Sequence, residues 1–515
     1  MEISAEVDNE EINAPLFFEN NGFFIFDRVT GLLLQVPKSN YNHILDVFRN
    51  AHTKSSLRRS ISEKIRNFEI KNPEFFEMLV ELNSSVGAFL KKVPVHIKEF
   101  SKDKIYEYIL REGLRELLLE VTTKCNLRCR YCVYSGIYNG YRSHSTEQMS
   151  FHVAMKAVDM YFDYLEKGSI YNPEREPAIG FYGGEPLLNF DLIKNVVNEV
   201  NYKYSKDYKI NFTITTNGTL LKDTAIDFLL LNNFSICISL DGPREEHDRN
   251  RIYADGRGTF DIILGNIRRI EQRAEELGLD RKGIPMYAVV TYDVKTDLRK
   301  LWKFFDEESP IQPIFVTPVR PIDTNYYSQF SKEDYQEFHK ISEELRDCFL
   351  DYVKNRKYLK GYSNFLESLY GVKVIAAYHR PLFVRIPFIY YTMSCIPGFK
   401  IFVDSKGTIH PCERSPSYIT VGNIDSGLDL NLIEEVLLKY QKEALKECAQ
   451  CYIAYNCPNC IALLGLKYHP QTCIRTREGF LENIKLAVQV YRENQEYLTT
   501  RSGIIGQLIN FIDFR

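Results

Sequence analysis

Short apolar runs alternate with longer amphipathic segments between residues 117 and 319. Two of the intervening segments, 151–165 and 259–277, repeat apolar residues at helical spacing. The runs are rich in β-branched and aromatic residues, as in strands buried on both faces of a sheet; they are 117–121, 178–182, 210–216, 234–240, 286–290 and 313–319. Strand followed by helix, six times, predicts an α/β fold with a partial (β/α)6 barrel of the TIM type and functional loops after the strands.

Charge and hydropathy narrow the range of partners. The formal net charge of −3 (65 basic minus 68 acidic residues) gives no reason to expect a nucleic acid or an anionic membrane. No apolar run approaches the roughly 18 residues that cross a bilayer, and the acidic start MEISAEVDNEE is unlike a secretory signal. We therefore expect a cytoplasmic protein with neither a nucleic-acid nor a membrane partner.

Ten of the 12 cysteines fall into two groups. In a reducing compartment such clustering indicates metal binding or catalysis more than disulfides. The remaining two, Cys237 and Cys348, lie in apolar contexts and are interpreted as small buried hydrophobic residues. The first group, Cys125, Cys129 and Cys132, follows the first predicted strand with the spacing C-x3-C-x2-C. The second group comprises Cys395, Cys412, Cys448, Cys451, Cys457, Cys460 and Cys473.

Turn-like motifs follow the next three predicted strands. They are GGEP at 183–186, TNG at 216–218 and SLDGP at 239–243. Each alone is typical of an ordinary turn. Because they end successive strands of one barrel, we expect them to converge with the cysteine triplet at the carboxyl edge of the sheet.

Three thiolates can hold three irons of a 4Fe-4S cube and leave the fourth iron open to a small molecule. With GGEP and SLDGP in register behind the triplet, the chain resembles the radical SAM superfamily. The resemblance implies that Cys125, Cys129 and Cys132 ligate a cluster whose open iron binds S-adenosylmethionine (SAM). An electron from a donor such as flavodoxin or ferredoxin would then cleave SAM to a 5′-deoxyadenosyl radical. For the triplet alone, a zinc site or three unrelated thiols is the alternative.

The same resemblance assigns contacts to SAM. The backbone beside Tyr131 would meet the adenine, and Ser239 matches a polar position that contacts SAM. Arg251, in HDRNR, would reach the carboxylate. The methionyl amine would lie against Gly183, Gly184 and Glu185.

The second cysteine group resembles the SPASM extension of radical SAM enzymes that modify peptides and proteins. It departs from the usual pattern by having two rather than three residues between Cys457 and Cys460. The resemblance implies two auxiliary 4Fe-4S clusters, which makes three clusters in all. The outer set would be Cys448, Cys451, Cys457 and Cys473, and the inner set Cys395, Cys412 and Cys460.

The inner set is one ligand short, because RIPFIYYTMSC, which ends at Cys395, offers no further cysteine. Glu413, directly after Cys412, is the candidate catalytic base. Zinc is the alternative for this region: the seven thiols could bind one zinc with four thiolates, or share two zincs.

The rest of the chain completes five predicted domains. Residues 1–95 contain two strands joined by a turn at Val29 to Gly31, then a Ser39-capped helix. They resemble the winged-helix domain that captures a leader peptide by strand addition, with a structural extension as the alternative. The barrel would occupy 112–325, a helical bridge 326–390, the SPASM domain 391–480 and a helical tail 481–515.

The predicted function is that of a radical SAM peptide maturase. It would install a crosslink, most simply a cysteine thioether, in a ribosomally made precursor peptide with a leader. One alternative is a protein maturase that oxidises a residue to formylglycine, and another is a peptide maturase that forms carbon–carbon bonds. The non-enzyme alternative is a zinc-stabilised binding module.

Overall fold

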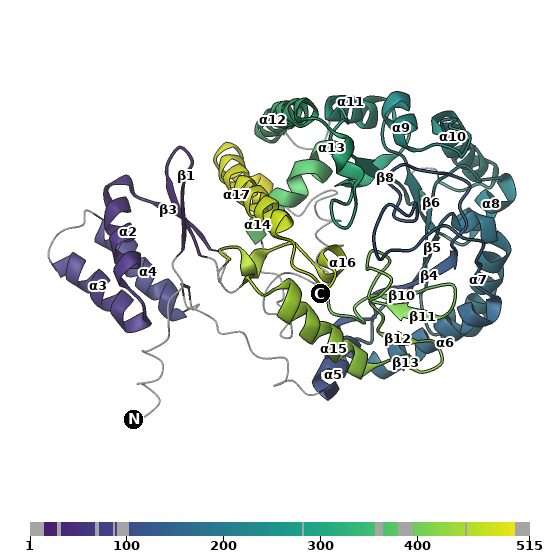
Figure 1. Cartoon of the computed structure of the whole chain (residues 1–515), viewed down its shortest axis with the longest axis horizontal. Coiled ribbons are helices and arrows are strands. Elements are labelled where there is room, and N and C mark those ends of the chain that lie inside the picture. The colour runs from purple at the N-terminus through teal and green to yellow at the C-terminus, as the bar shows by residue number, and fades with distance from the viewer. Residues whose placement is uncertain are drawn as a thin grey trace.

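The computed structural model describes residues 15–27, 32–66, 72–85, 88–89, 102–280, 283–355, 364–379, 395–448 and 451–499. A small N-terminal domain lies beside a large barrel, and the long helix α17 (Pro470–Glu493) passes between them (Figure 1). No helix in these ranges is both long and apolar enough to cross a membrane.

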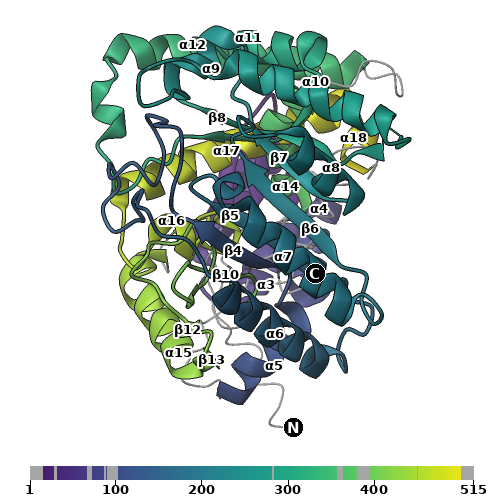
Figure 2. The same ribbon diagram turned by 90° about the vertical axis from the view of Figure 1, so that its right-hand side faces the viewer.

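Six parallel strands form the barrel wall and neighbour one another in chain order. They are β4 (Leu117–Thr122), β5 (Ala178–Gly183), β6 (Asn211–Thr216), β7 (Ser235–Ser239), β8 (Met286–Tyr292) and β9 (Gln312–Pro318). Figure 2 shows α6 (Phe151–Gly168), α7 (Phe190–Tyr204), α8 (Asp223–Leu231) and α10 (Phe260–Glu276) along the outside of this wall. The predicted partial (β/α)6 barrel is confirmed.

Side chains alternate along the strands between a dry outer layer and a polar interior. Ile214, Ile236 and Ile238 are fully buried in the core beneath the helices. Thr213 points the other way, and its hydroxyl donates to the Glu116 carboxylate at 3.2 Å. Cys237 shares the interior face of β7, so its thiol lies among polar groups and not in the apolar core.

The cysteine-rich region extends the barrel sheet beyond β4, on the side opposite β9. β10 (Ile401–Val403) pairs in parallel with β4, placing Ile401 opposite Leu117. β11 (Thr408–His410), β12 (Gly422–Asn423) and β13 (Gly427–Leu428) then continue the sheet antiparallel. The second cysteine group is therefore built onto the wall that carries the triplet.

The N-terminal domain is a three-stranded antiparallel sheet backed by helices. β1 (Leu16–Glu19), β2 (Phe23–Phe26) and β3 (Leu33–Val36) precede α2 (Tyr41–Asn50), α3 (Lys54–Arg66) and α4 (Pro73–Ser85). The two predicted strands are β2 and β3, while the predicted turn at Val29 to Gly31 lies outside the described residues. The predicted Ser39 cap is wrong, because a 3-10 turn, Lys38–Asn40, leads directly into α2 and no side chain caps it.

One face of this sheet packs on α2, α3 and α4, and the other packs on the C-terminal region. Phe18, Phe24 and Phe26 form a buried cluster with Ile453, Cys457 and three residues of α17: Phe480, Ile484 and Val488. Asn20 donates to the Lys485 carbonyl at 2.9 Å, and Arg492 donates to the Asn20 carbonyl at 2.9 Å. The domain is thus fastened to the segment that carries the outer cysteines.

The predicted bridge is helical where it is described. It contains α12 (Lys332–Asn355) and α14 (Val372–His379), and residues 380–390 lie outside the described ranges. The boundary expected at residue 480 falls inside α17, which is followed by α18 (Gln495–Thr499). The cysteine-rich region and the tail are therefore joined by one continuous helix.

Candidate active site

The triplet occupies the loop that follows β4. Cys129 is buried, and Cys125 and Cys132 are partly exposed. Main-chain N–H groups of Leu127 and Tyr134 donate to the sulfurs of Cys125 and Cys132, each at 3.4 Å. Hydrogen bonds of this kind favour sulfur in its thiolate form and tune iron–sulfur sites.

The three thiols are electrostatic neighbours. Burial raises the pKa of Cys125 to about 11, and both Glu185 and Cys129 add to the rise. Burial likewise raises the pKa of Cys132 to about 12, with contributions from Cys129 and Cys125. Burial therefore disfavours the thiolate form of these cysteines. Bound iron, as a cation, would stabilise the thiolates and offset this penalty.

The GGE motif lies against the start of the triplet loop. Gly184 N–H donates to the Thr122 carbonyl and Glu185 N–H to the Lys124 carbonyl, both at 2.8 Å. A Cβ added at Gly184 would meet the Lys124 oxygen at 2.1 Å, and one at Gly183 would meet the Thr122 oxygen at 2.1 Å. The two glycines are needed because the backbones approach so closely.

Glu185 is completely buried and ties three segments together. Its carboxylate accepts from the Thr216 hydroxyl at 2.7 Å, from Asn217 N–H at 2.7 Å and from Leu187 N–H at 3.1 Å. Burial raises its pKa to about 7, against the lowering effect of these donors. Its side chain thus holds the TNG turn against GGE, and the expected contact with the SAM amine stays a prediction.

The TNG turn reaches the triplet through Asn217. Its amide donates to the Asn126 side chain at 2.9 Å and lies 3.8 Å from the Cys125 sulfur. The sequence predicts that the TNG motif lies at the same carboxyl edge of the sheet as the triplet, but it indicates no role for Asn217. Its position beside a thiol could be recognised only once the strands were assembled.

Asp241 joins two of the predicted SAM contacts. Arg251 donates to the Asp241 carboxylate at 2.9 Å, and the Tyr131 hydroxyl donates to the same oxygen. The guanidinium lies 5.4 Å from the centre of the Tyr131 ring and beside the Cys129 thiol, where it counteracts the pKa rise caused by burial. The DGP sequence is typical of an ordinary turn, so the sequence alone does not identify Asp241. Ser239 ends β7 nearby, opposite Val289.

The second cysteine group divides in two by proximity. Desolvation and Cys460 raise the pKa of Cys395 to about 11, while burial, Glu413 and Cys460 raise that of Cys412 to about 12. Separately, burial raises the pKa of Cys448, and the thiols of Cys457, Cys451 and Cys473 raise it further. Cys460 is therefore a neighbour of both Cys395 and Cys412, and Cys448 is a neighbour of Cys451, Cys457 and Cys473.

The type and number of side chains in these groups suit iron–sulfur clusters, because such clusters are held by sets of three or four thiolates. Within the described ranges, no three His, Cys, Asp or Glu side chains are drawn together at metal-binding geometry. The assignment of all ten cysteines as ligands remains a prediction.

Glu413 is held in an ion-pair network. Lys400 lies 3.2 Å from Glu413 and 2.7 Å from Glu116. Burial acts to raise the pKa of Glu413, but Lys400 and Arg414 outweigh it and hold the pKa below the ordinary value. The carboxylate is therefore ionised at neutral pH, and its role as a base stays a prediction.

Tyr182 lies near both the triplet and the inner cysteine region. It stands on β5 opposite Glu120, with its ring 6.5 Å from that of Phe402 on β10. Burial, followed by the charges of Glu413 and Cys132, raises its pKa to about 12. Tyr182 is therefore close enough to sense charges in both cysteine regions, a proximity that the sequence did not reveal.

Comparison with known proteins agrees with this site. Residues 119–278 match the family model described as the radical SAM superfamily. A cysteine-type anaerobic sulfatase-maturating enzyme of Clostridium novyi is 26% identical over 311 residues, covering 59% of this chain and 74% of the relative. The radical SAM cyclopropyl synthase TigE of Paramaledivibacter caminithermalis is 23% identical over 465 residues, covering 87% of this chain and 88% of the relative.

A solved structure shares the fold. A histidine-tagged form of anSMEcpe with bound AdoMet superposes with a TM-score of 0.51 at 19% identity, covering 75% of this chain and 98% of that one. The match of the family model lies over the strands that carry the triplet, GGEP, TNG and SLDGP. The chain therefore carries a radical SAM domain at residues 119–278.

Proposed function

We propose that this protein is a peptide maturase that joins a cysteine sulfur of a precursor peptide to a carbon of the same peptide. The observation that carries the proposal is that the inner cysteine region is built onto the strand and loop that carry the triplet: β10 pairs with β4, and Arg142, in the loop after Cys132, donates to the carbonyl of Glu413, next to Cys412. A three-thiolate set leaves room for a fourth, soft ligand, and a peptide thiol is such a ligand.

Clusters with SAM on the triplet would supply the carbon radical and accept the electron released in bond formation. The chain's own residues have simpler tasks. Asn217, Asp241 and Arg251 fix the loops around Cys125 and Cys129. The ionised Glu413 can receive the thiol proton. Formation of the thioether thus removes one hydrogen from carbon and one from sulfur.

Two relatives favour neighbouring chemistries, and both remain alternatives. TigE is described as a cyclopropyl synthase and matches most of this chain, which supports a carbon–carbon product. The Clostridium novyi relative is described as a cysteine-type sulfatase-maturating enzyme, which supports oxidation of a protein cysteine. In neither of these products is the cysteine sulfur bonded to a second carbon, as it is in a thioether.

Spectroscopy of the inner cluster tests the proposed ligation. We expect its electron paramagnetic resonance signal in the reconstituted enzyme to change when a cysteine-containing precursor peptide is added. A peptide with that cysteine replaced by serine should leave the signal unchanged, because a hydroxyl is a poor ligand for this iron. A signal indifferent to the peptide thiol would remove the main support for a thioether.

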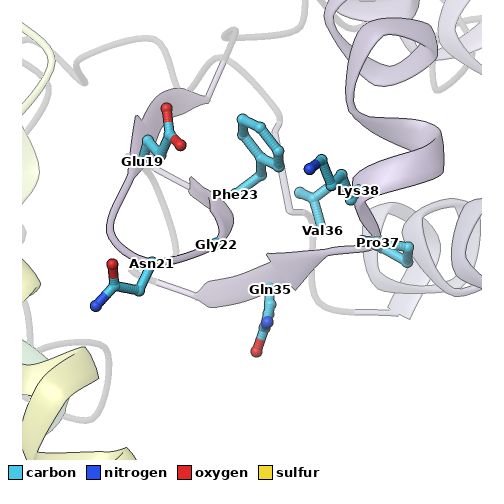
Figure 3. Close-up of a pocket in the computed structure, with 8 residues that line it drawn as sticks. All are labelled: Glu19, Asn21, Gly22, Phe23, Gln35, Val36, Pro37 and Lys38. Atoms are coloured by element: carbon cyan, nitrogen blue, oxygen red, sulfur yellow. The ribbon is translucent and has the colours of Figure 1, made fainter.

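The N-terminal sheet offers one edge for a leader peptide. Asp27 N–H donates to the Leu32 carbonyl at 2.8 Å, so antiparallel alternation turns the backbone groups of Leu33 and Gln35 away from β2. A hollow of about 700 Å³ lies at the end of β3, beside the turn between β1 and β2, and is lined by Glu19, Asn21, Gly22, Phe23, Gln35, Val36, Pro37 and Lys38 (Figure 3). We infer that the leader adds to β3 as a further strand.

Gln35→Pro tests this inference without removing the domain. Proline takes away the outward N–H of an exposed edge residue, and edge strands tolerate proline. We expect affinity for the full precursor to fall roughly threefold to tenfold, the worth of one hydrogen bond. Gln35→Val, which keeps the N–H, is the matched control. Equal affinity of both variants in calorimetric titration would argue for a structural role.

A further inference from the structure

Two arginines link the barrel to the inner cysteines. Arg320, just beyond β9, donates to the carbonyls of Ala462 at 2.8 Å and Leu463 at 2.6 Å. Arg142, in the loop after the triplet, donates to the carbonyls of Glu413 at 3.2 Å and Ser415 at 3.3 Å. Each pair of carbonyls lies within three residues after an inner cysteine, Cys460 for Arg320 and Cys412 for Arg142.

Both guanidinium groups are held in place by aromatic rings. Arg320 lies 4.5 Å from the centre of the Tyr141 ring, and Arg142 lies 4.4 Å from that of Phe402. Only 9% of the Arg142 side chain is exposed, and Glu120 lies 3.5 Å from it. Arg320 uses both terminal nitrogens, whereas Arg142 makes both of its carbonyl bonds through Nη1. An arginine stacked on a ring and bonded in this way has little freedom, unlike a surface arginine.

The loop that begins at Cys132 provides most of this support. It supplies Tyr141 and Arg142, and its Gly140 carbonyl accepts from Ser417 N–H at 2.9 Å. Cys412 follows β11, whereas Cys460 immediately precedes a short helix, Ile461–Leu464, in a different part of the chain. The residues that follow Cys412 and Cys460 are therefore both bonded to arginines of the barrel, which lie in or stack on the loop that follows the triplet.

We propose that Arg142 and Arg320 are positioning residues that set the distance and orientation of the inner cysteine group relative to the triplet. The proposal rests on the proposed function, in which chemistry begun at the triplet is completed beside the inner group. Rigid placement matters there because small displacements of reacting groups cost large factors in rate. The competing role is that of a staple that only adds stability.

Arg175 provides a matched control. It too donates through both terminal nitrogens to successive carbonyls, those of Leu110 at 3.1 Å and Arg111 at 2.5 Å. Its Nε, like that of Arg320, is buried with no hydrogen-bond partner among the described residues. It precedes β5, at the amino end of the strands and away from the loops that carry the triplet. Arg175→Gln should therefore cost similar stability without moving the triplet, Cys412 or Cys460.

The test compares Arg320→Gln, Arg320→Lys and Arg175→Gln in the reconstituted full-length enzyme. For Arg320→Gln we expect the number of 5′-deoxyadenosine molecules formed per modified peptide to rise roughly tenfold. We also expect an altered inner-cluster resonance signal and faster alkylation of Cys460 in the metal-free protein. Arg320→Lys, which keeps the charge but loses the fork, should give intermediate values. Arg175→Gln should match the wild type in all three.

The outcomes separate the two roles. If Arg320→Gln and Arg175→Gln lower the melting temperature alike and leave all three readouts at wild-type values, Arg320 is a staple and the proposal is overturned. Wild-type values in Arg320→Lys would contradict the need for the fork. The alkylation rate and the resonance signal do not depend on the product, so failure of the wild-type enzyme to form a thioether would count against the proposed function alone.

Discussion

Replacement of Cys125 by alanine is expected to abolish reductive cleavage of SAM. With Cys125 replaced, only two thiolates would remain, so two irons of the cluster would have no protein ligand. The cluster would then no longer have one particular iron reserved for SAM. The outer and inner groups should keep their iron, because their cysteines begin at Cys395 on other segments. Total iron should therefore fall by about one third, while 5′-deoxyadenosine formation with dithionite falls to background.

Cys348→Ala is the control for this variant. Cys348 lies on α12, outside both cysteine groups, and should be replaceable without loss of iron or activity. Substantial SAM cleavage by Cys125→Ala would overturn the assignment of the triplet and, with it, every role derived from the triplet.

Gly184→Ala is expected to be nearly as damaging, for a steric reason. The new Cβ would lie 2.1 Å from the Lys124 carbonyl oxygen, closer than any real contact. Relief requires the backbone next to Cys125 to move, and overpacking of this kind typically costs about 1–3 kcal/mol or more. We expect a lower melting temperature and loss of iron from the triplet.

Gly265→Ala is the matched control, since its added Cβ would meet no atom within 4 Å among the described residues outside its own turn of helix. It stands inside α10, where alanine is favoured over glycine by about 1 kcal/mol, so stability should be unchanged or higher. A Gly184→Ala protein with wild-type iron content and melting temperature would show that the GGE motif does not determine the position of the triplet.

The barrel could be predicted because each strand is a buried apolar run with a helix behind it. Runs such as 178–182 and 286–290 can be recognised as buried strands from their own apolar residues, without any knowledge of tertiary contacts. β12 and β13 have two residues each, too few to show periodicity, and the pairing of β10 with β4 joins segments far apart in the chain. The sheet extension was therefore beyond sequence reasoning, as was the 3-10 turn that replaces the Ser39 cap.

The site was predictable where a motif directly follows a strand. Gly184 and the triplet meet because parallel strands place their carboxyl ends together. Asp241, Tyr182 and Arg320 were missed because each acts through a partner on another segment, and nothing in the local sequence marks that partner. Glu185 shows the reverse case, since its motif was recognised but its bonds to Thr216 and Asn217 were not.

Mass spectrometry of the peptide product tests thioether formation most directly. The substrate would be a short cysteine-containing peptide encoded beside this gene, incubated with the reconstituted enzyme, SAM and a reductant. We predict a loss of two hydrogens, a cysteine that no longer reacts with iodoacetamide, and no product from the peptide with serine in place of that cysteine. A product that lacks two hydrogens but retains a fully alkylatable cysteine, or one whose cysteine has become formylglycine, would contradict thioether formation.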